Sequence, residues 1–325
     1  MDPLTLSDIE DAAQTVYRTM RPTPQYQWPL LAQAIGIEVW VKHENATPTG
    51  AFKVRGGLTL VDWLRRTHPT VKHLISSTRG NHGQSLALAA RNAGLEVTVF
   101  VPEGNATSKN AAMRGFGATV ITAGEDFDAS QLAAQAAAEE ADNCFLVPPF
   151  HPALVRGVAT YGWEFLSALP DLDVVIVPIG CGSGICGTIM ARDALGHRAK
   201  VIGVVSENAA TAKLSAEAGS PVITPSAITF ADGMAVRTPV EEALAIYRSG
   251  TEDIVTVSDD DIADAIRLYF EATHTVSEGA GAAPLAALMR YKDRFAGQKV
   301  GVIHCGQNID THWFVQVLNG ETPIP

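Results

Sequence analysis

Short runs of β-branched residues alternate with alanine-rich segments along most of this 325-residue chain. Neighbouring parallel strands need a long crossover connection, usually a helix, so the alternation predicts an α/β fold in which helices cover both faces of a parallel sheet. Gly94 and Gly196 each follow an alanine-rich segment and are typical of helix ends. The runs expected to form buried strands are residues 97–101, 119–122, 174–177, 201–205 and 300–304.

The length of the chain favours two lobes, because single domains usually hold about 100–150 residues. No internal repeat, low-complexity tract or long linker divides the sequence. We therefore expect the chain to cross between the lobes at hinges near residues 69–71 and 147–150. This predicts a large domain made of residues 1–70 and 148–325, with a small domain of residues 71–147 inserted into it.

Composition excludes several classes of protein. Hydrophobic residues make up 46% and charged residues 18%, which is typical of a globular enzyme. The formal net charge is −11 and no basic run is present, so nucleic acid is not an expected partner. The N-terminus does not resemble a signal peptide and no apolar run reaches membrane-spanning length, which predicts a cytoplasmic protein without membrane contact. The spacing of Cys144, Cys181, Cys186 and Cys305 favours free thiols over disulfides or a zinc site.

One lysine stands where a strand-like segment, residues 37–43, gives way to a helix. This residue, Lys53, follows Phe52 and has glycines on both sides, Gly50 and Gly56, which let the backbone approach a ligand closely. A confined lysine lowers its pKa readily and suits Schiff-base chemistry. A solvated lysine at a helix start is the alternative interpretation.

The segment 174–187 is an apolar strand followed by a glycine-rich loop that opens a helix. Backbone N–H groups and the helix dipole favour a phosphate there, whereas a tight turn alone would need fewer glycines. Gly182, Gly184 and Gly187 also fit the dinucleotide fingerprint, with Glu207 at the end of the next strand. A nicotinamide-dependent oxidoreductase is therefore the competing hypothesis, although it leaves the lysine segment without a purpose.

A second polar loop, residues 76–85, follows a strand-like pair and leads into the helix expected at 86–92. Its hydroxyl, amide and N–H groups suit a substrate carboxylate at a helix N-terminus, and an elaborate N-cap is the structural alternative. Near the C-terminus, Cys305 and Asn308 follow the last strand and should lie at the same sheet edge as the glycine loop. A buried inert thiol is the alternative for Cys305.

Together these segments resemble the fold-type II pyridoxal-phosphate enzymes, and most closely the serine/threonine dehydratase and serine racemase group. The resemblance covers nearly the whole chain. It implies a tryptophan synthase β-like fold with two lobes, each holding a mostly parallel twisted sheet flanked by helices, the large one binding the cofactor and the small one the substrate. The motifs that carry it are Phe52-Lys53-x-Arg55-Gly56, Gly80-Asn81-His82-Gly83, the glycine loop, Ala231-Asp232-Gly233, Glu278 and the turn at Cys305.

The resemblance also implies roles for single residues. Lys53 would form the Schiff base with pyridoxal 5′-phosphate, Phe52 would lie beside the pyridine ring, Asn81 would bond its hydroxyl group and Cys305 its nitrogen. Gly180, Gly182, Ser183 and Gly184 would hold the phosphate, with Cys181 standing where glycine is usual, and Glu278 completes the cofactor site. The substrate-binding residues would be Ser77, Thr78, Arg79, Gly80, Asn81 and His82.

The implied activity is that of a lyase. An L-3-hydroxy-α-amino acid such as threonine, serine, 3-hydroxyaspartate or phenylserine would lose water by β-elimination and give a 2-oxo acid and ammonia. A thiol at the pyridine nitrogen stabilises a carbanion less than an aspartate does, which favours elimination over transamination. We expect a homodimer. A racemase-like isomerase is the nearest alternative, and a non-catalytic module that binds an amino acid or the cofactor is a more distant one.

At two positions the sequence differs from the family pattern, and each difference limits the expected activity. Arg79 stands where a serine racemase carries the serine that protonates Cα, so racemisation should be weak or absent. Its guanidinium could bind a second substrate carboxylate, as in 3-hydroxyaspartate, or else pair with a protein acid or close the cleft. Glu207 matches a glutamate of the family's divalent-cation site, but Lys213 replaces the nearby aspartate. We therefore predict no metal requirement.

Overall fold

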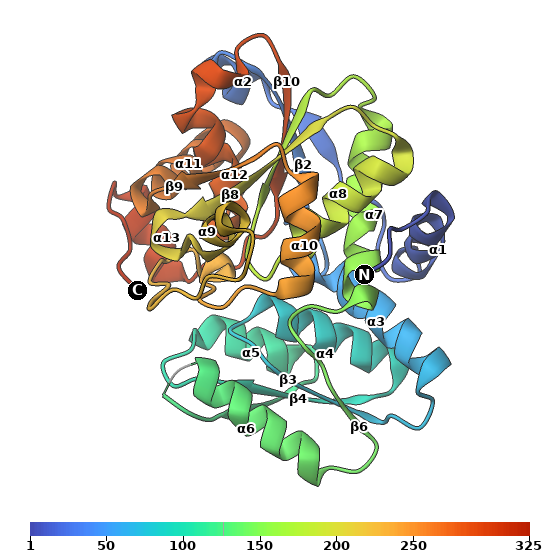
Figure 1. The fold of residues 1–325 in the computed structure, drawn as a ribbon. Helices are drawn as coiled ribbons and strands as arrows, with labels where there is room; N and C mark the ends of the chain where they lie inside the picture. Colours follow the sequence, from blue (N-terminus) through green and yellow to red (C-terminus); the bar gives the residue numbers. More distant parts are fainter. Residues whose placement is uncertain (126) are drawn as a thin grey trace.

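The computed structural model describes residues 1–125 and 127–325. Figure 1 shows two parts, one above the other, each built around its own sheet with helices packed against it. The described strands form a six-stranded and a four-stranded sheet, and every strand pair but one is parallel. The α/β class and the two mostly parallel sheets expected from the sequence are thereby confirmed.

The larger sheet has the strand order β1-β2-β10-β7-β8-β9, in which only the edge pair β1 and β2 is antiparallel. Val300 to Val302 pair with both β2 and β7, so β10 is central and lies between segments from distant parts of the chain. The strands are β1 (Gln25–Gln27), β2 (Glu38–His43), β7 (Val174–Pro178), β8 (Lys200–Ser206), β9 (Asp253–Val257) and β10 (Lys299–His304).

The smaller sheet has the strand order β5-β4-β3-β6 and is parallel throughout. Its central strands carry buried apolar residues such as Leu74 and Val99. The edge strand β5 is mostly exposed, which corrects the expectation that residues 119–122 form a buried strand: it pairs on one side only. The strands are β3 (His73–Ser77), β4 (Glu96–Val101), β5 (Thr119–Thr122) and β6 (Cys144–Leu146).

The helices cover these sheets and separate consecutive parallel strands. Two of them begin with reciprocal capping boxes, at Thr5 with Asp8 and at Ser258 with Asp261. The α-helices are α1 (Leu6–Tyr17), α2 (Pro29–Ile35), α3 (Lys53–Thr67), α4 (Asn81–Ala93), α5 (Thr107–Gly115), α6 (Phe127–Glu140), α7 (Pro152–Ala168), α8 (Ser183–Leu195), α9 (Thr211–Ala218), α10 (Glu241–Gly250), α11 (Asp259–Thr273), α12 (Gly279–Arg290) and α13 (Thr311–Leu318). Short 3₁₀ turns are η1 (Glu207–Ala209), η2 (Asp232–Met234) and η3 (Lys292–Phe295).

Helix α7 lies between α3 and α8 and contacts both at close range. A Cβ atom at Gly157 would lie 2.2 Å from the Thr59 hydroxyl and 2.3 Å from the Arg55 carbonyl oxygen, so α3 approaches α7 only because glycine stands there. A Cβ at Gly187 would lie 2.9 Å from the Ala159 nitrogen. Gly187 therefore allows α8 to pack closely on α7.

Two helices begin earlier than the sequence indicated. The helix expected at 86–92 starts at Asn81, and the helix after the glycine loop starts at Ser183. Polar residues and glycines in their first turns look like loop in the sequence, but a first turn tolerates them because its N–H groups have no partner within the helix. The loops that face the site are correspondingly short.

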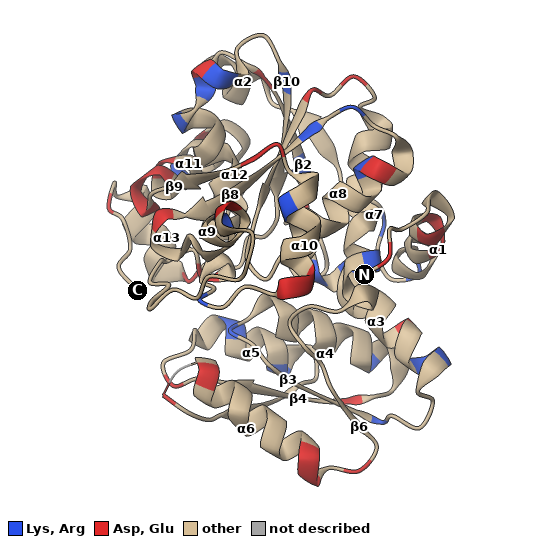
Figure 2. Ribbon diagram, in the orientation of Figure 1, with Lys and Arg blue, Asp and Glu red and all other residues tan. Residues whose placement is uncertain are grey.

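We propose the domain boundaries expected from the sequence, because residues 73–146 supply every strand of the smaller sheet. Helix α3, which these boundaries assign to the large domain, also packs on the smaller sheet: its buried side chains Val54 and Leu60 lie in one apolar cluster with Leu74 and Val99. Basic and acidic residues are interspersed over both parts (Figure 2). Within the described residues, no helix combines the length and apolar character that crossing a membrane requires.

Candidate active site

A cavity of about 150 Å³ lies where strands of both sheets end. Ser77 ends β3, Pro178 ends β7 and Cys305 follows β10, so the cavity occupies the position where open α/β sheets bind ligands. The structure brings every site residue predicted from the sequence to its wall. These are Phe52, Lys53, Ser77, Thr78, Arg79, Gly80, Asn81, His82, Gly180, Cys181, Gly182, Ser183, Gly184, Glu278 and Cys305.

Other lining residues were not predicted as site residues. Asp232 belongs to a motif that the sequence did reveal, but Lys109 lies in a polar helix that resembles an ordinary solvent-facing one. It is only 5% exposed, and no sequence signal marks its burial. The remaining unpredicted residues of the wall are Phe127, Pro149, Pro178, Gly233, Met234, Ala235, Val236 and Ala280.

Lys53 is held beside the end of β10 by a short antiparallel contact. The Phe52 N–H donates to the Cys305 carbonyl oxygen at 3.0 Å, and the Gln307 N–H donates to the Gly50 carbonyl oxygen at 2.9 Å. Ala51 and Gly306 form an isolated bridge between these two bonds. The first residue of α3 is thereby fixed against the C-terminal strand.

The Lys53 amine lies at the N-terminus of α8. Its Nζ atom is 3.0 Å from Ser183 Oγ and 5.1 Å from the centre of the Phe52 ring. Burial lowers the pKa of Lys53, although two neighbouring thiols and one carboxyl group act in the opposite direction. An amine with a lowered pKa is neutral more often near pH 7, which is the form needed for nucleophilic attack or for accepting a proton.

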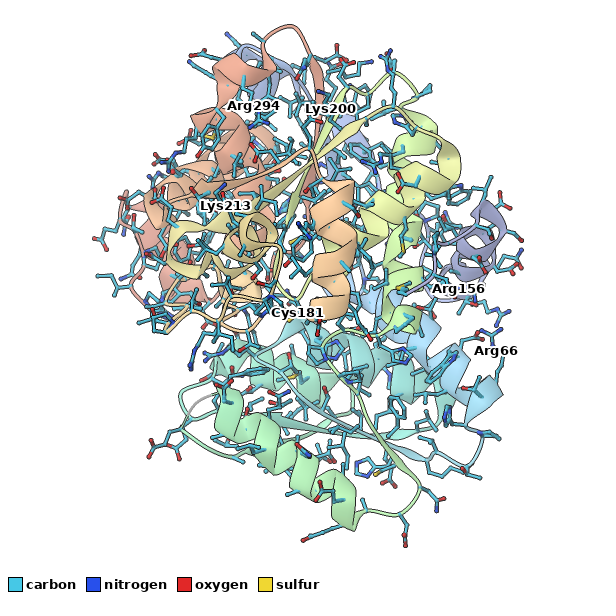
Figure 3. The ribbon with its side chains drawn as sticks, viewed as in Figure 1. Arg66, Arg156, Cys181, Lys200, Lys213 and Arg294 are labelled. Carbon is cyan, nitrogen blue, oxygen red and sulfur yellow. The ribbon has the colours of Figure 1, made fainter. Side chains whose placement is uncertain are left out.

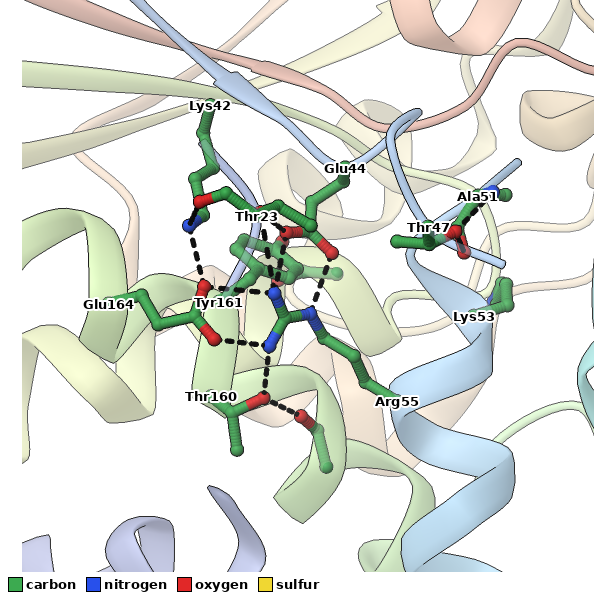
Figure 4. A network of polar contacts seen from close by, with 12 residues as sticks. Thr23, Lys42, Glu44, Thr47, Ala51, Lys53, Arg55, Thr160, Tyr161 and Glu164 are labelled. Carbon is green, nitrogen blue, oxygen red and sulfur yellow. Dashed lines mark hydrogen bonds and ion pairs between the residues drawn. The ribbon is translucent and has the colours of Figure 1, made fainter. Parts of the chain in front are cut away.

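A buried ionic network anchors the first turn of α3, two residues beyond Lys53 (Figure 4). Arg55 donates to both Glu44 oxygens at 2.7 and 2.9 Å and to both Glu164 oxygens at 2.6 and 2.9 Å. Lys42 Nζ donates to Glu164 at 2.6 Å. Burial opposes the charge on Arg55, but the two carboxylates outweigh it and raise its pKa. Two cations and two anions are thus balanced where no side chain is more than 5% exposed.

The N-terminus of α8 has the geometry of an anion site. Gly182 has φ +97° and no side chain caps the helix, and within the described chain the N–H groups of residues 183–185 donate to no acceptor. A Cβ atom at Gly180 would lie 2.3 Å from the Gly233 carbonyl oxygen. Glycine is therefore required there, and Cys181 lies in the same turn, near the boundary between the two parts (Figure 3).

The N-terminus of α4 also opens into the cavity without a side-chain cap. The Asn81 amide donates to Glu278 at 2.7 and 3.0 Å, and the Asn81 oxygen accepts from Asn308 Nδ2 at 2.8 Å. Burial raises the pKa of Glu278 to about 7, with Lys109 opposing the shift and Asp232 adding to it. Asn81 therefore connects the small sheet's helix to two segments of the larger part.

Four further ionisable groups line the wall. Lys109 pairs with Asp232 across the cavity, and a Cβ atom at Gly80 would lie 2.6 Å from Lys109 Cδ. Burial and the nearby Lys53 charge lower the pKa of His82 to about 3, so its imidazole is neutral. Arg79 is exposed, and in the described part of the chain its guanidinium has no hydrogen-bonding or ionic partner. The alternative in which it pairs with a protein acid is thus not observed.

This set of groups fits a flat, phosphate-bearing aldehyde: one buried amine, one aromatic ring and one uncapped helix N-terminus meet in a single cavity. A family model described as "Pyridoxal-phosphate dependent enzyme" matches residues 16–306. The chain belongs to this family. Its cofactor is pyridoxal phosphate, which decides against the dinucleotide interpretation of the glycine spacing.

Proteins with named activities and solved structures are also similar to this chain. The L-threonine ammonia-lyase of Thermotoga maritima is 33% identical over 97% of this chain and 78% of its own. The L-threo-3-hydroxyaspartate ammonia-lyase of Saccharomyces cerevisiae is 31% identical over 99% of this chain and 98% of its own. Among solved structures, threonine deaminase isoform 2 from Solanum lycopersicum superposes with a TM-score of 0.90 at 28% identity, covering 97% of this chain and 92% of that one.

Proposed function

We propose that this protein is a pyridoxal-phosphate-dependent ammonia-lyase that removes water from an L-3-hydroxy-α-amino acid and yields a 2-oxo acid and ammonia. The observation that carries the proposal is the contact between the Lys53 amine and Ser183, at an uncapped helix N-terminus that shares its cavity with a second one, that of α4. The first suits the cofactor phosphate and the second a substrate carboxylate. The named ammonia-lyase relatives support the reaction type.

The cofactor would be held by residues of both sheets. Gly180, Gly182, Ser183 and Gly184 would bind the phosphate, Phe52 would lie against the ring, Asn81 would bond its hydroxyl group and Cys305 its nitrogen. When bound, pyridoxal phosphate supplies the electron sink that makes the substrate Cα proton acidic. Burial raises the pKa of the Cys305 thiol, so the group that would face the ring nitrogen is neutral.

Lys53 would take the Cα proton, because burial lowers its pKa and favours the neutral amine. The N–H groups at the start of α4 and the Thr78 hydroxyl would hold the substrate carboxylate. Ser183 accepts a hydrogen bond from the Lys53 amine and would help to orient it. We propose that racemisation is weak, because Arg79 offers no neutral hydroxyl on the opposite side of the substrate.

A substrate panel tests the function. Serine, threonine, 3-hydroxyaspartate and phenylserine are each incubated with the holoenzyme, and ammonia, 2-oxo acid and the enantiomeric composition of the remaining substrate are measured. The proposal expects ammonia and 2-oxo acid in equal amounts. Racemised substrate without ammonia would support the isomerase alternative, and a visible cofactor spectrum with no turnover of any compound would support a binding module.

The protein's assembly and location are also part of this proposal. We infer a cytoplasmic homodimer whose small domain, residues 71–147, closes over the substrate while residues 1–70 and 148–325 hold the cofactor. The contacts of Asn81 with Glu278 and Asn308 join the two parts at the cavity, and they support the closure of the small domain. Light scattering coupled to gel filtration tests the dimer.

A further inference from the structure

The cavity offers more anion-binding features than the proposed reaction has used. The uncapped N-terminus of α8 accounts for the cofactor phosphate, and that of α4 accounts for the α-carboxylate that every amino-acid substrate carries. The cationic side chains on the wall are Lys53, Arg79 and Lys109. Only the first two lack a carboxylate partner among the described residues, since Lys109 is paired with Asp232.

Lys53 is committed to the cofactor in the proposed function, so Arg79 alone remains. It stands directly before Gly80 and the first turn of α4, beside the amides assigned to the α-carboxylate. Its guanidinium is exposed, and no described residue forms an ion pair or hydrogen bond with it. Guanidinium presents a rigid fork of donors that matches a carboxylate in a bidentate arrangement.

We propose that Arg79 binds an anionic group on the side chain of the substrate, which makes 3-hydroxy amino acids with a second carboxylate the preferred substrate class. This inference rests on the proposed ammonia-lyase function and adds which class of substrate the enzyme prefers. A substrate of this class places one carboxylate on the α4 amides and the other on Arg79, so its orientation is fixed at both ends. Threonine and serine leave Arg79 without a partner.

The test compares kcat/KM for 3-hydroxyaspartate, as both diastereomers, and for threonine. The proteins are the wild-type holoenzyme, Arg79→Gln, Arg79→Lys and the control Arg65→Gln, whose arginine is exposed on α3 outside the cavity. In Arg79→Gln the ratio of kcat/KM for 3-hydroxyaspartate to that for threonine should fall about 10- to 100-fold, the range expected when hydrogen bonds between charged groups are lost. Arg79→Lys should restore part of the ratio, and Arg65→Gln should keep it.

A second readout does not depend on turnover. Aspartate and 2-aminobutyrate differ by a side-chain carboxylate and lack the leaving hydroxyl, so their binding to the holoenzyme can be titrated by the change in the cofactor spectrum. Arg79→Gln should weaken the binding of aspartate more than that of 2-aminobutyrate. Added salt should reduce the preference for aspartate in the wild type, because the guanidinium is exposed and its attraction is screened.

The possible outcomes distinguish a failure of this inference from a failure of the proposed ammonia-lyase function. Equal losses on 3-hydroxyaspartate and threonine would assign Arg79 to the α-carboxylate and overturn the inference while leaving the ammonia-lyase intact. Turnover of threonine without turnover of either 3-hydroxyaspartate diastereomer would overturn it in the same way. Absence of ammonia from every 3-hydroxy amino acid would overturn both.

Discussion

The Asn81 side-chain amide donates to both carboxylate oxygens of Glu278, at 2.7 and 3.0 Å. Asn81 begins α4, beside the smaller sheet, and Glu278 precedes α12, beside the larger one, so this contact joins the two parts at the cavity wall. Glu278 is 3% exposed, and burial raises its pKa to about 7. A carboxyl group that changes its charge near neutral pH therefore holds the two parts together.

The raised pKa of Glu278 predicts a pH-dependent contribution to stability. Because the folded-state pKa of about 7 exceeds the ordinary value of 4.5, the protonated form stabilises the fold below pH 4.5, and this contribution is lost as pH rises toward 7. Between pH 5 and 8 the free energy of unfolding of the wild type should fall relative to Glu278→Gln by about 1–3 kcal/mol. Urea unfolding at several pH values measures the difference.

The control for this experiment is Glu103→Gln, which changes an exposed glutamate in the same way. Its difference from the wild type should stay constant over the same pH range. A constant difference for Glu278→Gln as well would contradict the assignment of a raised pKa to this carboxyl group.

Lys53→Ala should abolish both catalysis and the spectral signature of the bound cofactor. Loss of a group that acts as nucleophile and base costs about 10³-fold or more in kcat. Lys72→Ala, which removes an exposed lysine, should retain the activity and the visible band. Peptide mapping after hydride reduction should place the cofactor label on Lys53, and a label on any other residue would refute its role.

Arg55→Met should destabilise the protein by about 3–5 kcal/mol, because it leaves Glu44 as a buried carboxylate without a cation and Glu164 with Lys42 alone. The matched control lies on the same helix: Arg66 pairs with Asp62 at 2.8 Å but is 62% exposed, so Arg66→Met should cost less than about 1 kcal/mol. Denaturant unfolding compares the two variants. Similar costs for both would show that the network adds little stability.

Arg55 also positions Lys53, which lies two residues earlier in the first turn of α3. Arg55→Lys keeps the charge but loses the planar fork that bonds both carboxylates. We expect this variant to fold and to lower kcat about 10-fold, because small misplacements of a catalytic group are costly. A shift in the pH profile of kcat should accompany the loss, since a merely structural defect would leave the profile unchanged.

The sequence predicted the parts of this site that depend on local pattern. Apolar runs located β7 and β10, glycines located the loop after β7, and Lys53 located the segment after β2. It did not locate β1 or β9: Gln25–Gln27 is polar, and Asp253–Val257 begins with an acid. These are edge strands of the larger sheet, so one side of each needs no partner and their sequences are less constrained.

The rest of the wall depends on how the two parts meet. Lys109 comes from α5 and Asp232 from a 3₁₀ turn, and they form an ion pair although 122 residues separate them in the sequence. Lys109 has no local pattern that distinguishes it from a solvated charge, and the Ala231-Asp232-Gly233 motif does not indicate which residue Asp232 pairs with. The pair can be recognised only when the tertiary structure places the two residues together, whereas Ser183 and Asn81 were recognisable from their loops.

Gly180→Ala should weaken cofactor binding more than it weakens folding. An added Cβ would lie 2.3 Å from the Gly233 carbonyl oxygen, so the turn that faces the phosphate must shift. We expect the dissociation constant of pyridoxal phosphate to rise about 10-fold or more, as backbone donors move out of place. Gly115→Ala is the control, because its Cβ would meet nothing within 4 Å. Equal affinities in the two variants would argue against a phosphate at this turn.

The activity should not depend on a divalent cation. Glu207, which matches a glutamate of the cation site in related enzymes, is paired with Arg290 at 2.7 Å. Lys213, on α9 and well apart from Cys181 in Figure 3, donates to the Ile254 carbonyl oxygen at 2.9 Å. Arg290 therefore already neutralises Glu207, and dialysis against EDTA should leave kcat/KM unchanged.

Lys213→Asp provides the converse test, because it replaces the Lys213 ammonium with the carboxylate that hard divalent cations prefer. We expect this variant to gain thermal stability from millimolar Mg²⁺, while the wild type, whose Lys213 also pairs with Glu217 at 2.7 Å, should show no such response. Thermal unfolding with and without Mg²⁺ measures the effect. Wild-type activity that disappears in EDTA and returns with Mg²⁺ would mean that the protein's own cations do not replace the metal.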